Sequence, residues 1–305
     1  MKVLVIGGCG FIGSHIVDRL LESGYSVRVF DRNPERFRSP LGGVEYTFGD
    51  IKDSMAIIEA LQDVGMVMHL VSTTFPGTAD LDPQADVRDN LLTTLNLLEA
   101  MVKFGVSRLV YLSSGGTVYG IPERVPTPET HPLRPINSYG IVKTAIEHYI
   151  EMFGRTRGLS PIIIRPSNPY GPRQGHTGVQ GVVATFLNRI LRQEPIEIWG
   201  DGSVVRDYLY VEDLARLCVT AAASGKAGIY NGGSGEGTSL NEIVERIQEV
   251  TGSDTKPLYK PGRMVDVPRS ILDKSLVRKE FSWVPEVALT EGLGRTWDWV
   301  RANRA

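Results

Sequence analysis

A glycine-rich turn near the start of the chain limits how its first elements can be connected. The apolar run Val3–Ile6 is followed at once by Gly7-Gly8-Cys9-Gly10-Phe11-Ile12-Gly13, and Ser14–Leu21 then has the apolar spacing of a helix. Glycines at these positions let the backbone turn tightly and let the helix sit close to the strand. The chain is therefore expected to begin with a buried strand, a tight turn and a helix.

Apolar runs and helix-period segments continue to alternate through the first half of the chain. The further expected strands are Val27–Phe30, Val44–Phe48, Met66–Val71, Leu109–Leu112 and Ile162–Arg165, and the further helices are Ser54–Leu61, Leu91–Phe104 and Ser138–Met152. Strands without polar alternation are covered on both faces, as in a parallel sheet flanked by helices. The pattern predicts an α/β fold with a doubly wound parallel sheet of the Rossmann type.

The sequence changes character after Pro166, where a loop rich in glycine, proline and polar residues begins at Asn168. We expect residues 1–166 to form the sheet domain and residues 167–305 a smaller α/β lobe, with one or two elements returning to the sheet. The elements expected there are helices at Val182–Arg192, Val211–Ala223, Leu240–Val250 and Gly292–Val300, and strands at Ile196–Trp199, Gly228–Tyr230 and Pro257–Tyr259.

Composition excludes several classes of partner. The 305 residues carry a formal net charge of -2 with both signs interspersed, so neither nucleic acid nor an anionic membrane is an expected partner. Two cysteines cannot build a disulfide framework, and the five histidines lack metal-ligand spacing, so we predict no metal. The sequence has no signal-peptide layout and no apolar run of about 18 residues, which favours a cytoplasmic protein.

The glycine turn and a later carboxylate together indicate a dinucleotide site. Gly7 would make the turn, Gly10 would let the backbone approach a pyrophosphate, and Gly13 would bring the helix N-terminus to the phosphates. Asp31 ends the second expected strand, where a carboxylate can bond both ribose hydroxyls and disfavours a 2′-phosphate. Arg32 beside it would instead accept that phosphate. We predict NAD rather than NADP as the cofactor.

Asp50 and Ile51 follow the third expected strand and could bracket the adenine. Asp50 could equally cap the helix that begins near Ser54, and the sequence leaves both possibilities open.

Tyr139 and Lys143 lie four residues apart at the start of an expected helix that Ser138 could cap. Their side chains therefore share one helix face. A nearby ammonium and a positive nicotinamide ring would lower the phenol pKa from about 10 toward neutrality, making Tyr139 a general base. A lone YxxxK pattern is more often a surface pair, but here it follows a dinucleotide signature.

With these motifs the chain resembles the extended short-chain dehydrogenase/reductase family, in its nucleotide-sugar epimerase and dehydratase branch. The resemblance covers almost the whole chain. It rests on Gly7–Gly13, Tyr111-Leu112-Ser113-Ser114, Val118-Tyr119-Gly120, Tyr139–Lys143, Arg165-Pro166-Ser167-Asn168-Pro169-Tyr170-Gly171-Pro172, Trp199-Gly200-Asp201-Gly202, Arg206-Asp207-Tyr208 and Val211-Glu212-Asp213.

The resemblance implies that the sheet domain binds NAD and the smaller lobe binds a nucleotide sugar. The cofactor residues it implies, beside those above, are Phe11, Ile12, Leu70, Val71, Ser72, Asn90, Ser113 and Pro166. The substrate residues it implies are Asn168, Val182, Arg206, Arg263, Asp266 and Ser270, with the two arginines on the pyrophosphate. Asp213 is expected only to cap the helix that follows it.

One position departs from the family pattern. Relatives usually carry Ser or Thr where this chain has Gly115, to bond the reacting sugar hydroxyl. Ser114 or Thr117 must supply that hydroxyl, or Tyr139 works without it.

The resemblance favours C4 epimerisation of a UDP-sugar. Gly116 and Thr117 stand where 4,6-dehydratases place an acid pair, so dehydration is disfavoured. Ser270 matches the sugar-pocket gate, and its small side chain would admit UDP-N-acetylglucosamine beside UDP-glucose. A UDP-glucuronate 4-epimerase and an NAD(P)H-dependent 4-keto-sugar reductase are the enzymatic alternatives, and a non-catalytic dinucleotide-binding scaffold is the other class. The apolar stripes Leu91, Leu95, Leu98, Val102 and Ile141, Ala145, Tyr149 resemble the helices through which relatives form homodimers, although burial against the sheet would explain them as well.

Overall fold

Seven parallel strands form the large sheet in residues 1–175, 181–262 and 267–303, which the computed structural model describes. The strand order is β11-β6-β5-β4-β1-β2-β3. The strands are β1 (Lys2–Ile6), β2 (Ser26–Asp31), β3 (Val44–Phe48), β4 (Met66–His69), β5 (Arg108–Leu112), β6 (Ser160–Pro166) and β11 (Gly228–Gly232). All neighbouring pairs are parallel, so the predicted doubly wound sheet is confirmed.

The strand order reverses between β1 and β4, and this reversal determines where a ligand can bind. In open α/β sheets the ligand crevice lies beyond the carboxyl ends of the strands at such a switch point. The glycine turn follows β1, and Leu70–Ser72 follow β4 at the same edge. Leu70 N donates a hydrogen bond to Ile6 O (3.1 Å), so the two chain segments leave the sheet side by side.

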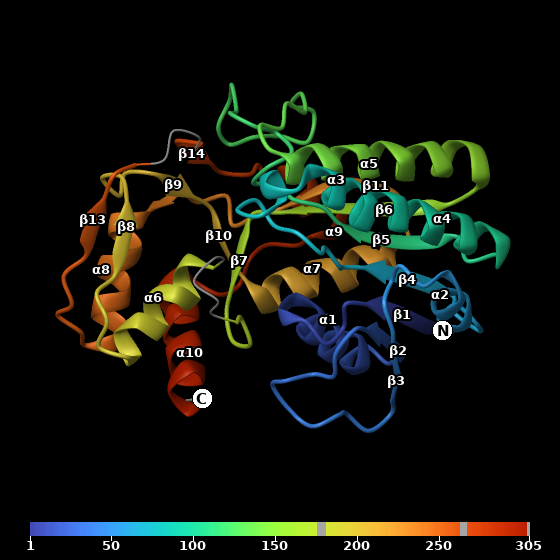
Figure 1. Ribbon diagram of the computed structural model, residues 1–305, viewed down its shortest axis with the longest axis horizontal. Helices are drawn as coiled ribbons and strands as arrows, with labels where there is room; N and C mark the ends of the chain where they lie inside the picture. Colours follow the sequence, from blue (N-terminus) through green and yellow to red (C-terminus); the bar gives the residue numbers. More distant parts are fainter. Residues whose placement is uncertain (176–180, 263–266, 304–305) are drawn as a thin grey trace.

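Helices cover both faces of this sheet (Figure 1). One face is covered by α1 (Phe11–Glu22) and α7 (Val211–Ser224), and the other by α2 (Ser54–Ala60), α4 (Thr93–Lys103) and α5 (Ser138–Arg157). Successive residues of β1 therefore enter different cores: Val3 and Val5 pack on the α1 side, and Leu4 and Ile6 on the α4 side. Burial on both faces explains the uninterrupted apolar run.

The helix expected at Leu91–Phe104 begins differently in the structure. The chain before α4 forms a short turn η1 (Ala79–Leu81), the helical turn α3 (Pro83–Asp86), and a π-helical segment η2 (Val87–Leu92) that leads into α4. π-helical turns often occur at functional sites. Here the irregular region contains Asp86 and Asn90, both buried and polar, next to the start of α5.

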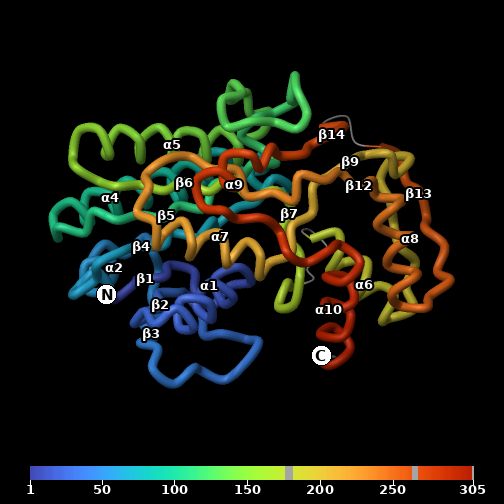
Figure 2. The backbone as a smooth tube through the Cα atoms, turned by 180° about the vertical axis from the view of Figure 1, so that it is seen from behind, coloured from blue at the N-terminus to red at the C-terminus, as the bar shows by residue number. Residues whose placement is uncertain are grey.

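A smaller lobe lies at the end of the molecule away from the large sheet (Figure 1). Figure 2 shows the lobe and the sheet from behind. It contains α6 (Val182–Leu191), α8 (Leu240–Thr251) and α10 (Leu289–Ala302), with the paired strands β8 (Glu197–Trp199) and β13 (Leu258–Lys260). Apolar side chains of these elements share one core that includes Phe186, Leu187 and Ile243. These elements were all predicted from the sequence.

Several C-terminal elements return to the large sheet. β11 is its outermost strand beside β6, and α7 packs against α1. The helix α9 (Ser275–Phe281), which was not predicted from the sequence, adds Val277 to the core on the α1 side of the sheet. The division of the chain at residue 166 therefore stays a prediction, since the two parts interleave.

Short strands that the sequence pattern did not indicate lie between the sheet and the smaller lobe (Figure 2). They are β7 (Asn168–Tyr170), β9 (Val205–Arg206), β10 (Tyr208–Tyr210), β12 (Thr238–Ser239) and β14 (Arg269–Ser270). β7 pairs with β10, and β9 pairs with both β12 and β14. Strands of two or three residues are too short to show a period.

Two expected helix caps were wrong. Asn137, not Ser138, caps α5 by accepting a hydrogen bond from Gly140 N (2.8 Å), because the Ser138 hydroxyl instead donates to Asp86 (2.8 Å). Asp213 lies inside α7 and accepts backbone N–H groups of residues 286 and 287, so it does not cap that helix.

Within the described residues, no helix combines the length and the apolar composition that a membrane span requires.

Candidate active site

The glycine turn has no room for side chains at three of its positions, and a Cβ on Gly8 would lie 2.8 Å from Val29 Cγ2. Gly7 has φ +90°, and a Cβ built there would lie 2.8 Å from Val71 Cγ2. A Cβ on Gly13 would lie 2.0 Å from the carbonyl oxygen of Gly7, inside any tolerable contact. The first turn of α1 therefore lies directly on the loop, as a dinucleotide site requires. The cradle fits the predicted NAD cofactor.

Asp31 stands at the end of β2 and bonds back to this turn. Its carboxylate accepts hydrogen bonds from Cys9 N (3.0 Å) and Arg32 N (2.7 Å). The Arg32 guanidinium lies 3.2 Å from the carboxylate of Asp50. Asp50 is not the cap of α2, because Asp53 accepts the N-terminal N–H groups of that helix. The structure thus brings the predicted ribose-side residues together along one edge of the sheet.

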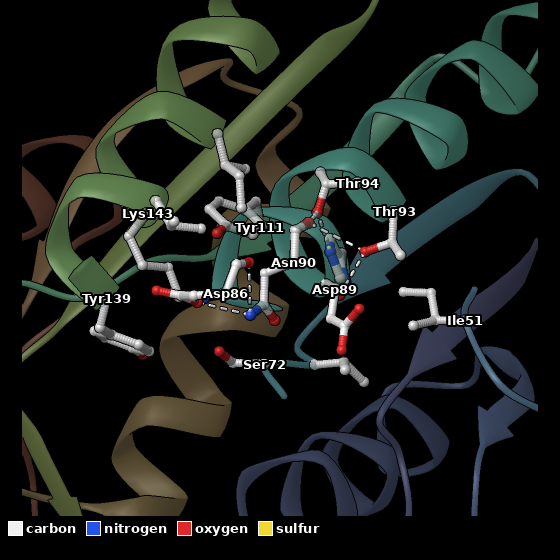
Figure 3. Close-up of a pocket in the computed structure, with 14 residues that line it drawn as sticks. Ile51, Ser72, Asp86, Asp89, Asn90, Thr93, Thr94, Tyr111, Tyr139 and Lys143 are labelled. Carbon is white, nitrogen blue, oxygen red and sulfur yellow. Dashed lines mark hydrogen bonds between the residues drawn. The ribbon is translucent and has the colours of Figure 1, made fainter. Parts of the chain in front are cut away.

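A small pocket lies beyond the ends of β4 and β5, and several of the predicted residues line it (Figure 3). It has room for about one water molecule beyond the atoms that line it. Its lining includes the predicted residues Ile51, Val71, Ser72, Asn90, Tyr139 and Lys143. Residues predicted for the cofactor and for catalysis, which lie far apart in the sequence, therefore share one pocket.

Asn90 is held within the protein by several hydrogen bonds. Its Oδ1 accepts from Thr73 N (2.8 Å), and its Nδ2 donates to the Asp86 carboxylate (2.8 Å). Asp86 is fully buried and also accepts from Ser138 and Thr74. Asn90 and Asp86 together therefore hold the loop after β4 against the start of α5, and any contact of Asn90 with the cofactor is a proposal. Asp86 was not singled out from the sequence, since its partners come from three separate segments.

Tyr139 is half-buried, and its hydroxyl interacts with the hydroxyls of Ser114 and Ser72. Burial raises the pKa of Tyr139 to about 12, with a further increase from the Asp86 charge, while the two serine hydrogen bonds lower it. Lys143 does not lower the pKa of Tyr139 in the protein alone. Of the two hydroxyls proposed to replace the family's usual one, Ser114 is the one that contacts Tyr139.

Lys143 is buried and points toward the sheet. Its Nζ donates to Leu112 O (2.9 Å) and lies 5.7 Å from the centre of the Tyr139 ring. Burial lowers the Lys143 pKa from 10.5 to about 8, although the charges of Glu147 and Asp86 oppose this. Lys143 thus anchors α5 to β5 and keeps its ammonium near the Tyr139 ring.

Replacing Lys143 with methionine should stabilise the fold and abolish activity. The lysine pKa is lower in the folded state than in the unfolded state, so its ammonium opposes folding at pH 7. We expect the free energy of unfolding to rise by roughly 1–3 kcal/mol at pH 7, part of the gain being offset because Leu112 O loses its donor. This advantage should shrink between pH 8 and 10.5, where folded wild type deprotonates first.

Urea unfolding of both proteins across this pH range tests the expectation. Lys103→Met, at the exposed end of α4, is the surface control and should leave stability unchanged. A Lys143→Met protein less stable than wild type at pH 7 would contradict the argument.

A buried ion pair lies one helical turn beyond Lys143. Arg165 and Glu147 are 2% and 1% exposed at their side chains and bond through Nη2 and Oε2 at 2.5 Å. Ser113, predicted to touch the cofactor, donates its hydroxyl to Glu147, and Arg165 Nη1 donates to the Tyr119 hydroxyl (2.9 Å). This network joins α5 to β5 and β6. An arginine ending the apolar strand Ile162–Arg165 was the signal that could have indicated it.

Gly115 is explained by a side chain from the far end of the chain. A Cβ at residue 115 would lie 2.5 Å from Leu272 Cδ1 and 3.1 Å from Arg165 O. Leu272 is 1% exposed, so it occupies the space where the family's Ser or Thr would stand. Thr117, the other candidate hydroxyl, has its Oγ1 buried without a hydrogen-bond partner among the described residues.

Gly115→Ala should therefore destabilise the protein by about 1–3 kcal/mol, the usual range for overpacking. Gly116→Ala is the matched control, because no heavy atom lies within 4 Å of a Cβ there. Leu272→Ala opens the space, so the double variant should lose less stability than the sum of the two single losses. Urea unfolding of wild type, Gly115→Ala, Leu272→Ala and the double variant measures this coupling. Stability losses that simply add would rule out the steric explanation.

Of the predicted substrate residues that the structure describes, Asn168, Arg206 and Ser270 lie on the short strands. Ser270 pairs with Arg206 between β14 and β9, and Asn168 Nδ2 donates to Asp207 O (3.0 Å). Arg206 Nη1 donates to Val267 O (2.6 Å). Val182 is the first residue of α6, and Pro166 ends β6 beside Gly232. Arg263 and Asp266 lie outside the described residues.

Comparisons with known proteins agree with this geometry. Residues 3–233 match the NAD dependent epimerase/dehydratase family. A UDP-glucose 4-epimerase of Mycolicibacterium smegmatis is 36% identical over 309 residues, covering 99% of each chain. The crystal structure of a Thermotoga maritima UDP-glucose 4-epimerase with UDP-glucose superposes with a TM-score of 0.95 at 39% identity, covering 100% of both chains.

A Thermus thermophilus UDP-glucose 4-epimerase in complex with NAD has a TM-score of 0.92 at 38% identity, and the match covers 99% of this chain and 100% of that one. Likeness of this extent includes the glycine cradle, the Tyr139–Lys143 helix and the smaller lobe. The chain belongs to the NAD dependent epimerase/dehydratase family and is an NAD-dependent enzyme.

Proposed function

We propose that this chain inverts the configuration at C4 of a UDP-hexose, with Tyr139 as the catalytic base. One observation carries the proposal: the Tyr139 hydroxyl interacts with Ser114 and Ser72 beside a pocket that Lys143 and the cofactor-side residues line. The relatives described above act on UDP-glucose, and they support this choice of substrate class. UDP-glucose and its C4 epimer are the expected pair.

The chain's own residues handle the proton. Tyr139 Oη takes the proton of the C4 hydroxyl, with Ser114 holding that hydroxyl in line and the Lys143 ammonium favouring the phenolate. Bound NAD would supply the hydride acceptor and donor for C4, and its positively charged ring would favour the phenolate further. After the 4-keto sugar has rotated in the site, so that its opposite face meets the nicotinamide, Tyr139 returns the proton to the C4 oxygen. Each cycle ends with no net oxidation.

The short strands would hold the nucleotide end of the substrate. We assign Asn168 and Arg206 to the diphosphate, since a guanidinium can bond two phosphate oxygens at once. By the family resemblance we assign Arg263 and Asp266, which lie outside the described residues, to the diphosphate and the ribose. Ser270 would face the sugar, where its small side chain leaves room for an N-acetyl group at C2. The Thr117 hydroxyl, which has no partner among the described residues, is a second candidate for bonding the sugar.

A homodimer is the proposed assembly. Ile141 on α5 is 55% exposed, Met152 is 41% exposed, and Leu92 at the start of α4 is 49% exposed. Large apolar side chains gathered on neighbouring helices are typical of an interface. Leu98 of the expected stripe is buried in the core instead, so only part of the stripe is available. Light scattering at micromolar concentration tests this, and a monodisperse monomer would overturn it.

Proton NMR of the sugar tests the proposed reaction directly. The purified protein is incubated with NAD and, separately, UDP-glucose, UDP-N-acetylglucosamine or UDP-glucuronate, without any reductant. The expected result is inversion at C4 without net NADH formation. Unchanged sugars in every tube, together with consumption of reduced cofactor on a 4-keto nucleotide sugar, would overturn the epimerase in favour of a reductase.

A further inference from the structure

Asp207 is a fully buried carboxylate between β9 and β10 that the proposed reaction does not use. Its two oxygens accept hydrogen bonds from Ser234 N (2.8 Å), Ser234 Oγ (2.7 Å), Gly235 N (3.1 Å) and Leu272 N (3.2 Å). Burial of a carboxylate is costly unless several donors satisfy it. These four bonds hold the loop after β11 and the segment after β14 against the short strands.

The backbone of the same residue joins two predicted substrate residues. Asp207 N donates to Ser270 O (3.0 Å), and Asp207 O accepts from both Asn168 N (3.0 Å) and Asn168 Nδ2 (3.0 Å). Arg206 precedes it in the chain and pairs in register with Ser270. Every substrate candidate on the short strands is thus bonded to Asp207 or adjacent to it.

The Asp207 side chain also reaches the catalytic loop through one intermediate. It anchors Leu272 by that residue's backbone N–H, and the Leu272 side chain packs where a Cβ on Gly115 would lie. Gly115 follows Ser114, the serine that contacts Tyr139. One carboxylate therefore links the diphosphate side of the site to the loop beside the base.

We propose that Asp207 is a positioning residue, which sets Asn168, Arg206 and Ser270 at the spacing that a nucleoside diphosphate requires. This inference rests on the proposed function, because it assumes that the short strands bind the nucleotide end of the substrate. Asp207 touches neither the sugar nor the cofactor in this proposal; it acts through the strands that it connects.

Asp207→Asn tests this with almost no change in shape. Each oxygen of the Asp207 carboxylate accepts two hydrogen bonds. In asparagine one of these oxygens becomes an NH₂ group, which cannot accept them, so at least one connection between the strands and the loop is lost. The dissociation constant of UDP is measured by calorimetry on the NAD-loaded protein, and that of NAD on the stripped protein. We expect UDP affinity to fall by at least about tenfold and NAD affinity to stay within about twofold.

Asp213→Asn is the matched control. Asp213 is also buried and accepts backbone N–H groups, those of Glu286 (3.0 Å) and Val287 (3.0 Å), yet its partners include no substrate candidate. Both variants should lower the unfolding temperature, and only Asp207→Asn should weaken UDP. Equal weakening of UDP by both, or no weakening by Asp207→Asn, would show that Asp207 serves stability alone.

Ser234→Ala keeps the test decisive if Asp207→Asn does not fold. It removes a single donor to Asp207 and should still weaken UDP severalfold with NAD affinity unchanged; unchanged UDP affinity would overturn the proposal. Failure of the proposed function would look different, because wild type itself would then bind no UDP or leave C4 unchanged.

Discussion

Replacing Tyr139 with phenylalanine is expected to lower kcat for C4 inversion by roughly 10²–10⁴-fold, the usual contribution of a positioned acid–base group. The substitution removes only the hydroxyl that interacts with Ser114 and Ser72. UDP-glucose affinity and NAD content should therefore stay near wild type. Steady-state kinetics by the NMR assay, with calorimetry for binding, separates these effects.

The control for this change is Tyr230→Phe. Tyr230 lies on β11, and its hydroxyl donates to Lys226 O (3.2 Å), so the loss of this hydroxyl should leave kcat unchanged. A Tyr139→Phe protein with full epimerase activity would refute the assigned base. Biological function that survives without any epimerase activity would instead favour the non-catalytic scaffold.

The second large effect is expected at Gly13. An alanine Cβ would lie 2.0 Å from Gly7 O and 2.9 Å from Gly8 Cα, and these are backbone atoms that cannot turn aside. The first turn of α1 must then move away from the glycine turn, which displaces the N–H groups expected to bind the pyrophosphate. We expect NAD affinity to fall by at least about 100-fold, equivalent to about 2.7 kcal/mol.

Gly294→Ala provides the comparison for Gly13. It is also a helical glycine, in α10, and the nearest atom to its Cβ would be Val250 Cγ1 at 4.0 Å. An alanine there should be neutral or slightly stabilising, because alanine favours helix by up to about 1 kcal/mol over glycine. NAD titration of both variants decides the matter. Equal NAD affinity in the two would mean that the clash at Gly13 is absorbed elsewhere.

Much of the sheet domain could be predicted because its signals are local. An apolar run buried on both faces, a glycine turn and a helical period each occupy a few consecutive residues, and they identified β1 to β6 and their helices. The short strands β7, β9, β10, β12 and β14 were not predicted, since two or three residues carry no period. These strands are fixed by partners from distant segments, such as Asp207 with Leu272.

The candidate site, too, was predicted from the sequence only in part. The spacing of Tyr139 and Lys143 placed both on one helix face, but it could not say that Lys143 would bond Leu112 O instead of the phenol. Burial and the Asp86 charge raise the pKa of Tyr139 in the protein alone. The downward shift expected with a positive nicotinamide ring beside the phenol stays a prediction.

The sequence by itself determined the order of the main strands and helices of the sheet domain, the glycine cradle and the helix that bears the base, because these depend on neighbouring residues. Only the tertiary structure decided that Ser114 contacts Tyr139, that Leu272 occupies the space above Gly115, and that Asp207 joins the substrate strands. Each of those contacts joins residues from distant parts of the chain. Contacts between residues so far apart in the sequence depend on how the strands and helices pack, so no local pattern can predict them.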